Sequence, residues 1–118
     1  MDEKVFAYLA GIVDGEGSLG MRPTCMNARA PRTVHYQPYL SIVNTDQALI
    51  HWLQAMIPEG KVYPRKPNKW SKKQAYMFGV YSRESIRRLL VGMLPYLIIK
   101  CAKAQEVLRA LEGFTPIL

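Results

Sequence analysis

The sequence predicts an α+β fold of the order α-β-β-α-β-β-α-α, with an antiparallel sheet and helices packed on one of its faces. In four segments, apolar residues recur at spacings of three and four, as in amphipathic helices. In four others, short runs rich in β-branched and aromatic residues indicate strands, and turn residues separate them. A chain of 118 residues suits one domain with one core, so residues 1–118 are expected to form a single domain.

The first helix is expected over residues 2–14, where acidic residues suit the positive N-terminal end. Gly15 and Gly17 should end it. Two strands are then expected over residues 18–26 and 36–43, joined by a basic turn or long hairpin tip.

A second helix should begin at Thr45 or Asp46 as its cap and carry an apolar stripe to Ile57, before a Pro and a Gly end it. Two further strands are expected at Lys61–Arg65 and Gln74–Tyr81. The segment between them is the most densely basic part of the chain.

Ser82 is expected to cap a third helix with the body Ser85–Leu94. Pro95 should then break the chain before a last helix from about Leu97 to Glu112, ended by Gly113.

Charge and composition narrow the function classes. The chain has 16 Lys and Arg against 9 Asp and Glu, a net charge of +7, which would attract a polyanion such as nucleic acid, although a basic protein need not bind one. Cys25 and Cys101 show no zinc-type or disulfide spacing. The apolar stretches are too short to span a bilayer, and the first residues do not form a secretory signal, so we expect an intracellular protein that does not enter a membrane.

A strip of small residues runs along the first predicted helix. Ala7, Gly11 and Gly15 lie four residues apart and would let another helix approach at backbone distance. That helix could belong to a second copy of the chain or to the chain's own core.

Two acidic residues, Asp14 and Glu16, follow at the C-terminal end of the same helix. Carboxylates are disfavoured there by the helix dipole unless something positive binds them. Oxygen ligands of this kind suit Mg²⁺, which uses one or two protein carboxylates and fills its other positions with water and phosphate oxygens. The alternative is that both are ordinary polar turn residues.

The run Tyr8-Leu9-Ala10-Gly11-Ile12-Val13-Asp14-Gly15-Glu16-Gly17-Ser18 resembles the motif of the LAGLIDADG homing endonucleases. A single motif is similar to that of the homodimeric members, which implies a magnesium-dependent double-strand cut in a long, pseudo-palindromic DNA target that leaves 3′ overhangs. By this resemblance Glu16 binds the catalytic metal, and the backbone carbonyl of Gly15 faces it. Mn²⁺ is expected to substitute for Mg²⁺, and Ca²⁺ to support binding without cleavage.

The resemblance extends, more weakly, to most of the chain. Val43-Asn44-Thr45-Asp46 resembles the segment whose last residue orients water, which gives that role to Asp46, although Asp46 could also be a helix cap. The stretch Leu94 to Lys100 resembles the one that supplies a family lysine, here Lys100, which could stabilise charge at the scissile phosphate. Otherwise Lys100 is a solvated helix residue.

In the same family the sheets form a saddle in the major groove, so alternate strand residues should face DNA. The expected base-reading residues are Arg22, Thr24, Gln37, Tyr39 and Ser41. Leu40 and Ile42 should face inward. The expected phosphate contacts are Arg65, Lys66, Lys69, Lys72 and Lys73, and the basic turn adds the DNA-binding candidates Arg29 and Arg32.

Two other functions fit the same fold: a maturase-like protein that binds intron RNA, and a DNA-binding regulator without catalysis. The presence of Glu16, Asp46 and Lys100 favours the nuclease. The expected compartment is the cytoplasm of a prokaryotic or phage-infected cell, or the matrix or stroma of an organelle.

Overall fold

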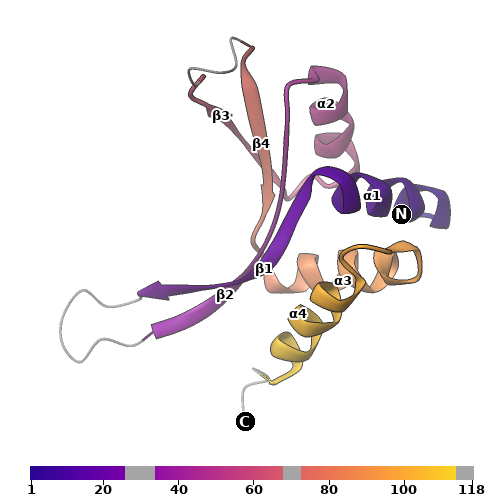
Figure 1. The fold of residues 1–118 in the computed structure, drawn as a ribbon, viewed down its shortest axis with the longest axis vertical. Coiled ribbons are helices and arrows are strands. Elements are labelled where there is room, and N and C mark those ends of the chain that lie inside the picture. Colours follow the sequence, from indigo (N-terminus) through magenta and orange to yellow (C-terminus); the bar gives the residue numbers. More distant parts are fainter. Residues whose placement is uncertain (26–33, 68–72, 114–118) are drawn as a thin grey trace.

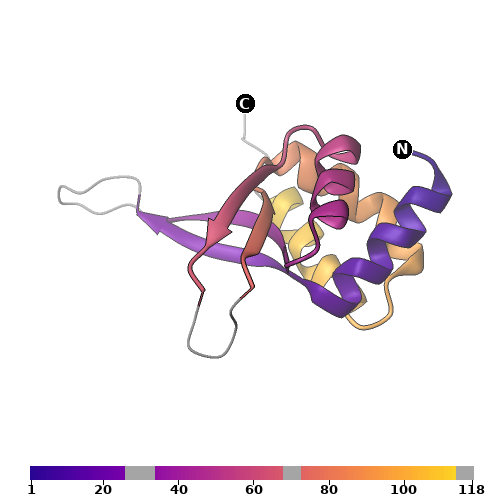
Figure 2. The ribbon, with the colours of Figure 1, turned by 90° about the horizontal axis from the view of Figure 1, so that it is seen from above.

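The computed structural model describes residues 1–25, 34–67 and 73–113. The element order agrees with the sequence prediction, with one short 3₁₀ helix added before the last helix. Figure 1 shows the helices together on one side of the strands, and the view from above in Figure 2 shows the same separation. None of the helices in the described part of the chain has the length and apolar character needed to cross a membrane.

The helices and strands have the following bounds: α1 Glu3–Glu16, β1 Gly17–Cys25, β2 Val34–Asn44, α2 Gln47–Met56, β3 Lys61–Arg65, β4 Ala75–Val80, α3 Arg83–Met93, the 3₁₀ helix η1 Leu94–Tyr96, and α4 Cys101–Gly113. The four strands form one sheet in the order β1-β2-β4-β3, and every neighbouring pair is antiparallel.

The strand register divides the sheet into two faces. Ser41 of β2 lies opposite Ser18 of β1 and Gly79 of β4, and Gly79 also lies opposite Lys61 of β3. Because side chains alternate along a strand, these residues share the face turned away from the helices, called the outer face below. The inner face carries the buried sheet residues Leu19, Leu40, Ile42, Phe78 and Val80. The expectation that Leu40 and Ile42 face inward is therefore confirmed.

Helix starts follow the capping residues that the sequence indicated. The Asp46 carboxylate accepts hydrogen bonds from the backbone N–H groups of Ala48 and Leu49, at 2.9 and 3.2 Å. The Ser82 hydroxyl accepts one from the N–H of Ser85, so α3 begins at Arg83, two residues before its expected body. Each cap satisfies N–H groups that the first helical turn leaves without a partner.

The first helix is longer than predicted. The expectation that Gly15 ends it is wrong, because α1 continues through Gly15 to Glu16 and its C-cap is Gly17. A Cβ atom at Gly17 would lie 2.8 Å from the Cα of Val13, so the tight passage from helix to strand requires glycine there. Glu16 is thus the last helical residue. The second strand also begins earlier than expected, at Val34, because it pairs with β1 as far as Cys25.

The last helix begins later than predicted. The expected start near Leu97 is wrong, since α4 begins at Cys101 and residues 98–100 form bends. The carboxylate of Asp14 accepts hydrogen bonds from the backbone N–H groups of Ile98 and Lys100, at 2.7 and 2.9 Å. A contact from an element more than eighty residues earlier therefore holds this segment outside the helix.

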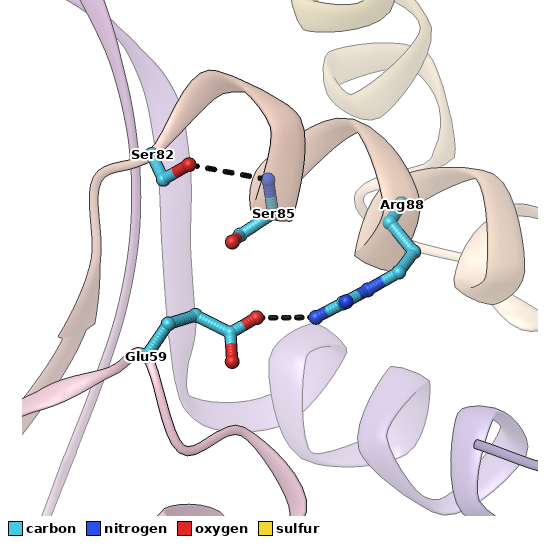
Figure 3. A network of polar contacts seen from close by, with 4 residues as sticks. All are labelled: Glu59, Ser82, Ser85 and Arg88. Atoms are coloured by element: carbon cyan, nitrogen blue, oxygen red, sulfur yellow. Dashed lines mark hydrogen bonds and ion pairs between the residues drawn. The ribbon is translucent and has the colours of Figure 1, made fainter.

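A polar network joins the turn after α2 to α3 (Figure 3). Glu59 forms an ion pair with Arg88, and Ser82 caps the same helix nearby. The backbone N–H of Glu59 itself, with the Ser85 hydroxyl and Arg88, holds the pKa of the Glu59 carboxyl below its ordinary value, against the effect of burial.

The residue after Glu59, Gly60, packs so closely on Phe78 that a Cβ atom would lie 2.1 Å from the ring.

The substitution Gly60→Ala should therefore destabilise the fold by about 1–3 kcal/mol, because the buried Phe78 ring would have to move. Removing the neighbouring surface ion pair by Glu59→Ala should cost about 1 kcal/mol or less. Urea denaturation of both variants measures the difference, and a Gly60→Ala protein as stable as the wild type would contradict the packing described.

Candidate active site and nucleic-acid interface

Glu16 occupies the corner where α1 passes into the sheet. Its side chain is exposed, and one carboxylate oxygen, Oε2, accepts a hydrogen bond of 2.6 Å from the side-chain amide of Asn44, the last residue of β2. A neutral amide fixes the direction of the carboxylate without cancelling its charge. The arrangement presents an oriented, exposed anion.

The same asparagine connects Glu16 to the second helix. The side-chain oxygen of Asn44 accepts a hydrogen bond of 2.8 Å from the backbone N–H of Asp46. Asp46 in turn uses a single oxygen, Oδ1, for both of its capping bonds to α2. Asn44 therefore bridges two of the residues that the sequence singled out, and the capping role considered for Asp46 is confirmed.

Asp14 joins the end of α1 to the start of α4 through hydrogen bonds from Ile98 and Lys100. Burial alone would raise the pKa of its carboxyl, but the N–H groups of Ile98, Lys100 and Ile99, together with the Lys100 charge, outweigh it and lower that pKa. Asp14 is therefore ionised at neutral pH and serves as an internal anchor. Its hydrogen-bond donors lie more than eighty residues away, so Asp14 is a tertiary anchor and not the ordinary turn residue that the sequence also allowed.

Lys100 lies where α4 begins. Its Nζ atom donates a hydrogen bond of 3.0 Å to the backbone carbonyl of Asp14, two residues before Glu16 on the last turn of α1. A cation at the C-terminal end of a helix is favoured by the helix dipole. Lys100 is half-buried and fixed at the end of α1, which excludes the reading of a freely solvated side chain.

The strip of small residues on α1 is open. A Cβ atom placed on Gly11 or Gly15 would have no neighbour within 4 Å, and Ala7 is half-buried. The two glycines therefore do not pack on the core of their own chain, which removes one of the two readings that the sequence allowed.

Large exposed apolar residues lie near the two ends of this strip, Tyr8 next to Ala7 and Ile98 beside Asp14. Tyr8 is 59% exposed and packs edge-on against Trp52, with ring centroids 5.0 Å apart. Ile98 and Ile99, next to the Asp14 anchor, are 85% and 73% exposed. Exposed apolar residues gathered around a helix with open glycines are typical of an interaction surface.

The outer face of the sheet carries the predicted base-reading residues together. Arg22 lies opposite Gln37, and Thr24, Tyr39 and Ser41 share their face by the same register. Arg65 continues this face on β3, while Lys66 and Lys73 are exposed beyond the ends of β3 and β4. Arg29, Arg32, Lys69 and Lys72 lie outside the described residues.

The charged residues of the strands are all basic, and they lie on one face of the sheet. None of the residues that form the four strands is Asp or Glu, whereas Arg22, Lys61 and Arg65 are all on the outer face. With no carboxylate among the strands to oppose a phosphate backbone, this face suits a polyanion.

The sequence reasoning missed several residues of this region. His35, Lys61 and Tyr63 share the outer face, and the alternation of β2 and β3 could have identified them, because they have the same parity as Gln37 and Arg65. Asn44 gave no comparable signal, since it acts through Glu16, which only the folded sheet brings close.

The described part of the chain brings together few ligands for a metal ion. In the described ranges, no group of three or more His, Cys, Asp or Glu side chains is placed to hold one. Glu16, as an exposed oxygen donor beside the exposed Gly15, fits a Mg²⁺ ion that takes one or two protein carboxylates and completes its shell with water and phosphate oxygens.

Comparison with solved structures identifies proteins of the same fold. The chain is similar to the homing endonuclease I-CvuI, solved with the I-CreI target in the presence of Mg with the DNA not cleaved; the identity is 26%, the TM-score 0.75, and 93% of this chain and 68% of that chain are covered. It also resembles the archaeal intron-encoded homing endonuclease I-Vdi141I complexed with DNA, with 14% identity, a TM-score of 0.71, and coverage of 96% and 70%.

A third similar structure is the LAGLIDADG meganuclease I-CpaMI bound to uncleaved DNA, with 19% identity, a TM-score of 0.72, and coverage of 91% of this chain and 37% of that one. No protein-family model matches the sequence, and no curated protein matches it. The similarity that these comparisons show is thus one of fold.

The lowered pKa of Asp14 predicts a pH dependence of stability. A carboxyl whose pKa falls on folding stabilises the native state when ionised, and this contribution disappears as the pH falls from about 4 through the native pKa. Asp14→Asn should therefore lower the free energy of unfolding by about 1–3 kcal/mol at pH 7, and its deficit should shrink below pH 4.

Urea denaturation between pH 7 and pH 3 measures the free energy of unfolding of the wild type and of Asp14→Asn. Asp2→Asn is the matched control, because Asp2 caps α1 and asparagine caps a helix equally well. A deficit for Asp14→Asn that stays the same at pH 3 would contradict the role of the ionised carboxylate.

Proposed function

We propose that this chain, which has the fold and the sequence motif of the single-motif LAGLIDADG homing endonucleases, is a DNA endonuclease that acts as a homodimer. The observation that carries the proposal is the end of α1, where the exposed, oriented Glu16 carboxylate lies beside an open strip of glycines. The solved DNA complexes of the similar proteins support the substrate class.

The dimer follows from the need for two cuts. One chain carries one Glu16 and one motif, whereas hydrolysis of both strands needs two sets of reacting groups. Gly11 and Gly15 would let the α1 helices of two copies approach at backbone distance, and the exposed Tyr8, Ile98 and Ile99 would be covered at the same time. Packing the two helices there would bring both Glu16 residues to one central place.

The metal ligands that we propose are the Glu16 carboxylate and the backbone carbonyl of Gly15. Bound Mg²⁺ would supply activation of the attacking water and stabilisation of the leaving oxygen. Asn44 keeps one oxygen of Glu16 fixed and leaves the other for the ion. As expected from the family resemblance, Mn²⁺ should replace Mg²⁺, and Ca²⁺ should support binding without cleavage.

Two further side chains assist at the scissile phosphate. Both capping bonds of Asp46 use Oδ1, so Oδ2 is the atom that we assign to hold and orient a water molecule. Lys100, fixed by the carbonyl of Asp14, adds positive charge beside Glu16 and would stabilise negative charge on the phosphate. By the same resemblance, cleavage should leave 3′ overhangs.

The outer face of the sheet would read the DNA. Its side chains Arg22 and Gln37 suit guanine and adenine in the major groove. Arg65, Lys66 and Lys73 at the far end of β3 and β4 would contact phosphates and set affinity more than sequence.

The substitution Glu16→Gln should separate cleavage from binding. Glutamine keeps an oxygen that can accept the Asn44 hydrogen bond but loses the charge that holds the metal. Cleavage of a randomised duplex DNA library in Mg²⁺ should fall by about 100-fold or more, while binding in Ca²⁺ should stay within a few-fold of the wild type.

Glu106→Gln, the same change on the exposed surface of α4, is the matched control and should cleave normally. A Glu16→Gln protein that cuts as fast as the wild type would remove this residue from the mechanism. A wild type that cuts no duplex in Mg²⁺ would contradict the nuclease itself.

The substitution Gly11→Leu should abolish the dimer and leave the protomer folded. The added side chain meets no neighbour of its own chain at Cβ but would separate two α1 helices. Sedimentation should show a monomer, while the circular dichroism spectrum should be unchanged. Ala102→Leu on the exposed side of α4 should stay dimeric, and a Gly11→Leu dimer of wild-type affinity would exclude this interface.

A further inference from the structure

An arginine on β1, a tyrosine on β2 and the tyrosine that directly follows β4 meet on the outer face of the sheet. The guanidinium carbon of Arg22, on β1, lies 5.8 Å from the ring centroid of Tyr39 on β2. It lies 5.3 Å from the ring centroid of Tyr81, the residue that follows β4. Both distances fall within the range of about 6 Å over which an aromatic ring face attracts a cation.

Two glycines make room for these rings. A Cβ atom at Gly79 would lie 2.4 Å from the hydroxyl oxygen of Tyr81, and one at Gly20 would lie 3.0 Å from that of Tyr39. The position that a side chain would occupy at each glycine is thus filled by a tyrosine. Both rings are half-buried, although they lie on the exposed face of the sheet.

The direction of Arg22 is set by this cluster. β1 is an edge strand, yet the side chain reaches inward across β2 to the residue at the end of β4. Its charge is therefore directed to the middle of the outer face and away from the sheet edge. A phosphate backbone would follow the rims of this face, and the base edges in the groove would lie over its middle.

The rings hold the arginine without neutralising it. A carboxylate partner would occupy the N–H donors and bring a negative charge towards DNA, and the strands contain none. A ring face attracts the positive charge and leaves the N–H donors for other partners. Arg22 is also exposed, so those donors are accessible.

We propose that Tyr39 and Tyr81 are positioning residues that hold Arg22 for bidentate recognition of one guanine in each half of the DNA target. This inference rests on the proposed function. A guanidinium held in a fixed direction matches the two acceptors, O6 and N7, that guanine presents in the major groove. Fixing it before binding reduces the rotamer entropy that recognition would otherwise cost.

The test is a selection of bound duplexes from a randomised DNA library in Ca²⁺, followed by sequencing. The wild type should enrich guanine at one position in each half-site, and Arg22→Met should lose that preference by about 10-fold or more. Tyr81→Leu should reduce the same preference about threefold to tenfold and keep the preferences at other positions, whereas Tyr81→Phe, which retains the ring, should preserve it.

Gly79→Ala provides an independent perturbation. Its methyl group would displace the Tyr81 ring, while Arg22 and both tyrosines remain the same residues. It should reproduce the selective loss seen in Tyr81→Leu. Tyr63→Leu is the matched control, since Tyr63 is on the outer face but on β3, at the opposite edge of the sheet from β1. It should leave the guanine position unchanged. Thermal melts confirm that each variant is folded.

Three outcomes would overturn the inference. If Arg22→Met weakens binding equally for all sequences, Arg22 contacts phosphate. If Tyr81→Leu and Gly79→Ala leave the guanine preference intact, the rings do not position the arginine, while the nuclease proposal stands. If the wild type enriches no sequence at all, sequence-specific DNA reading itself fails.

Discussion

The carboxylate of Asp14 is the constraint on which the corner of the candidate active site depends. It accepts hydrogen bonds from the backbone N–H groups of Ile98 and Lys100, so the end of α1 and the start of α4 are fixed to each other. The same contact places the Lys100 ammonium group on the carbonyl of Asp14. Without this anchor, residues 98–100 could join the helix that follows, and Lys100 would move with them.

The anchor also explains how two acidic residues can end one helix. Asp14 is turned inward and is compensated by N–H groups and a lysine, as its lowered pKa reflects. Glu16 is exposed, and in the described part of the chain its carboxylate accepts a hydrogen bond from the neutral amide of Asn44. Among the described residues, the hydrogen bonds of Lys100 hold it at Asp14, and we propose that the Glu16 carboxylate stays available to a cation from solution.

The sequence predicted correctly those features that depend on residues close to one another along the chain. The bounds of β3 and the Asp46 cap were correct because alternation and capping are decided within a few residues. The start of α4 was wrong because a side chain more than eighty residues away decides it. For the same reason Asn44 was overlooked: its importance lies in a contact with Glu16, and a single sequence gives no signal for such a pair.

The two candidate functional regions share one way of positioning charged groups. Glu16 is oriented by an amide and Arg22 by aromatic rings, and neither partner carries a compensating charge. Opposite charges would orient both groups more strongly, but an ion pair would also satisfy them before a ligand arrived. Neutral partners fix direction and preserve charge, so the metal ligand that we propose, Glu16, and the base-reading arginine that we propose, Arg22, are ordered in advance and remain available to a cation and to a base edge. A charged side chain can thus be held rigidly and still be available to a ligand. Gly20 and Gly79 matter as much as the charged residues, because they leave the space that the tyrosine rings occupy.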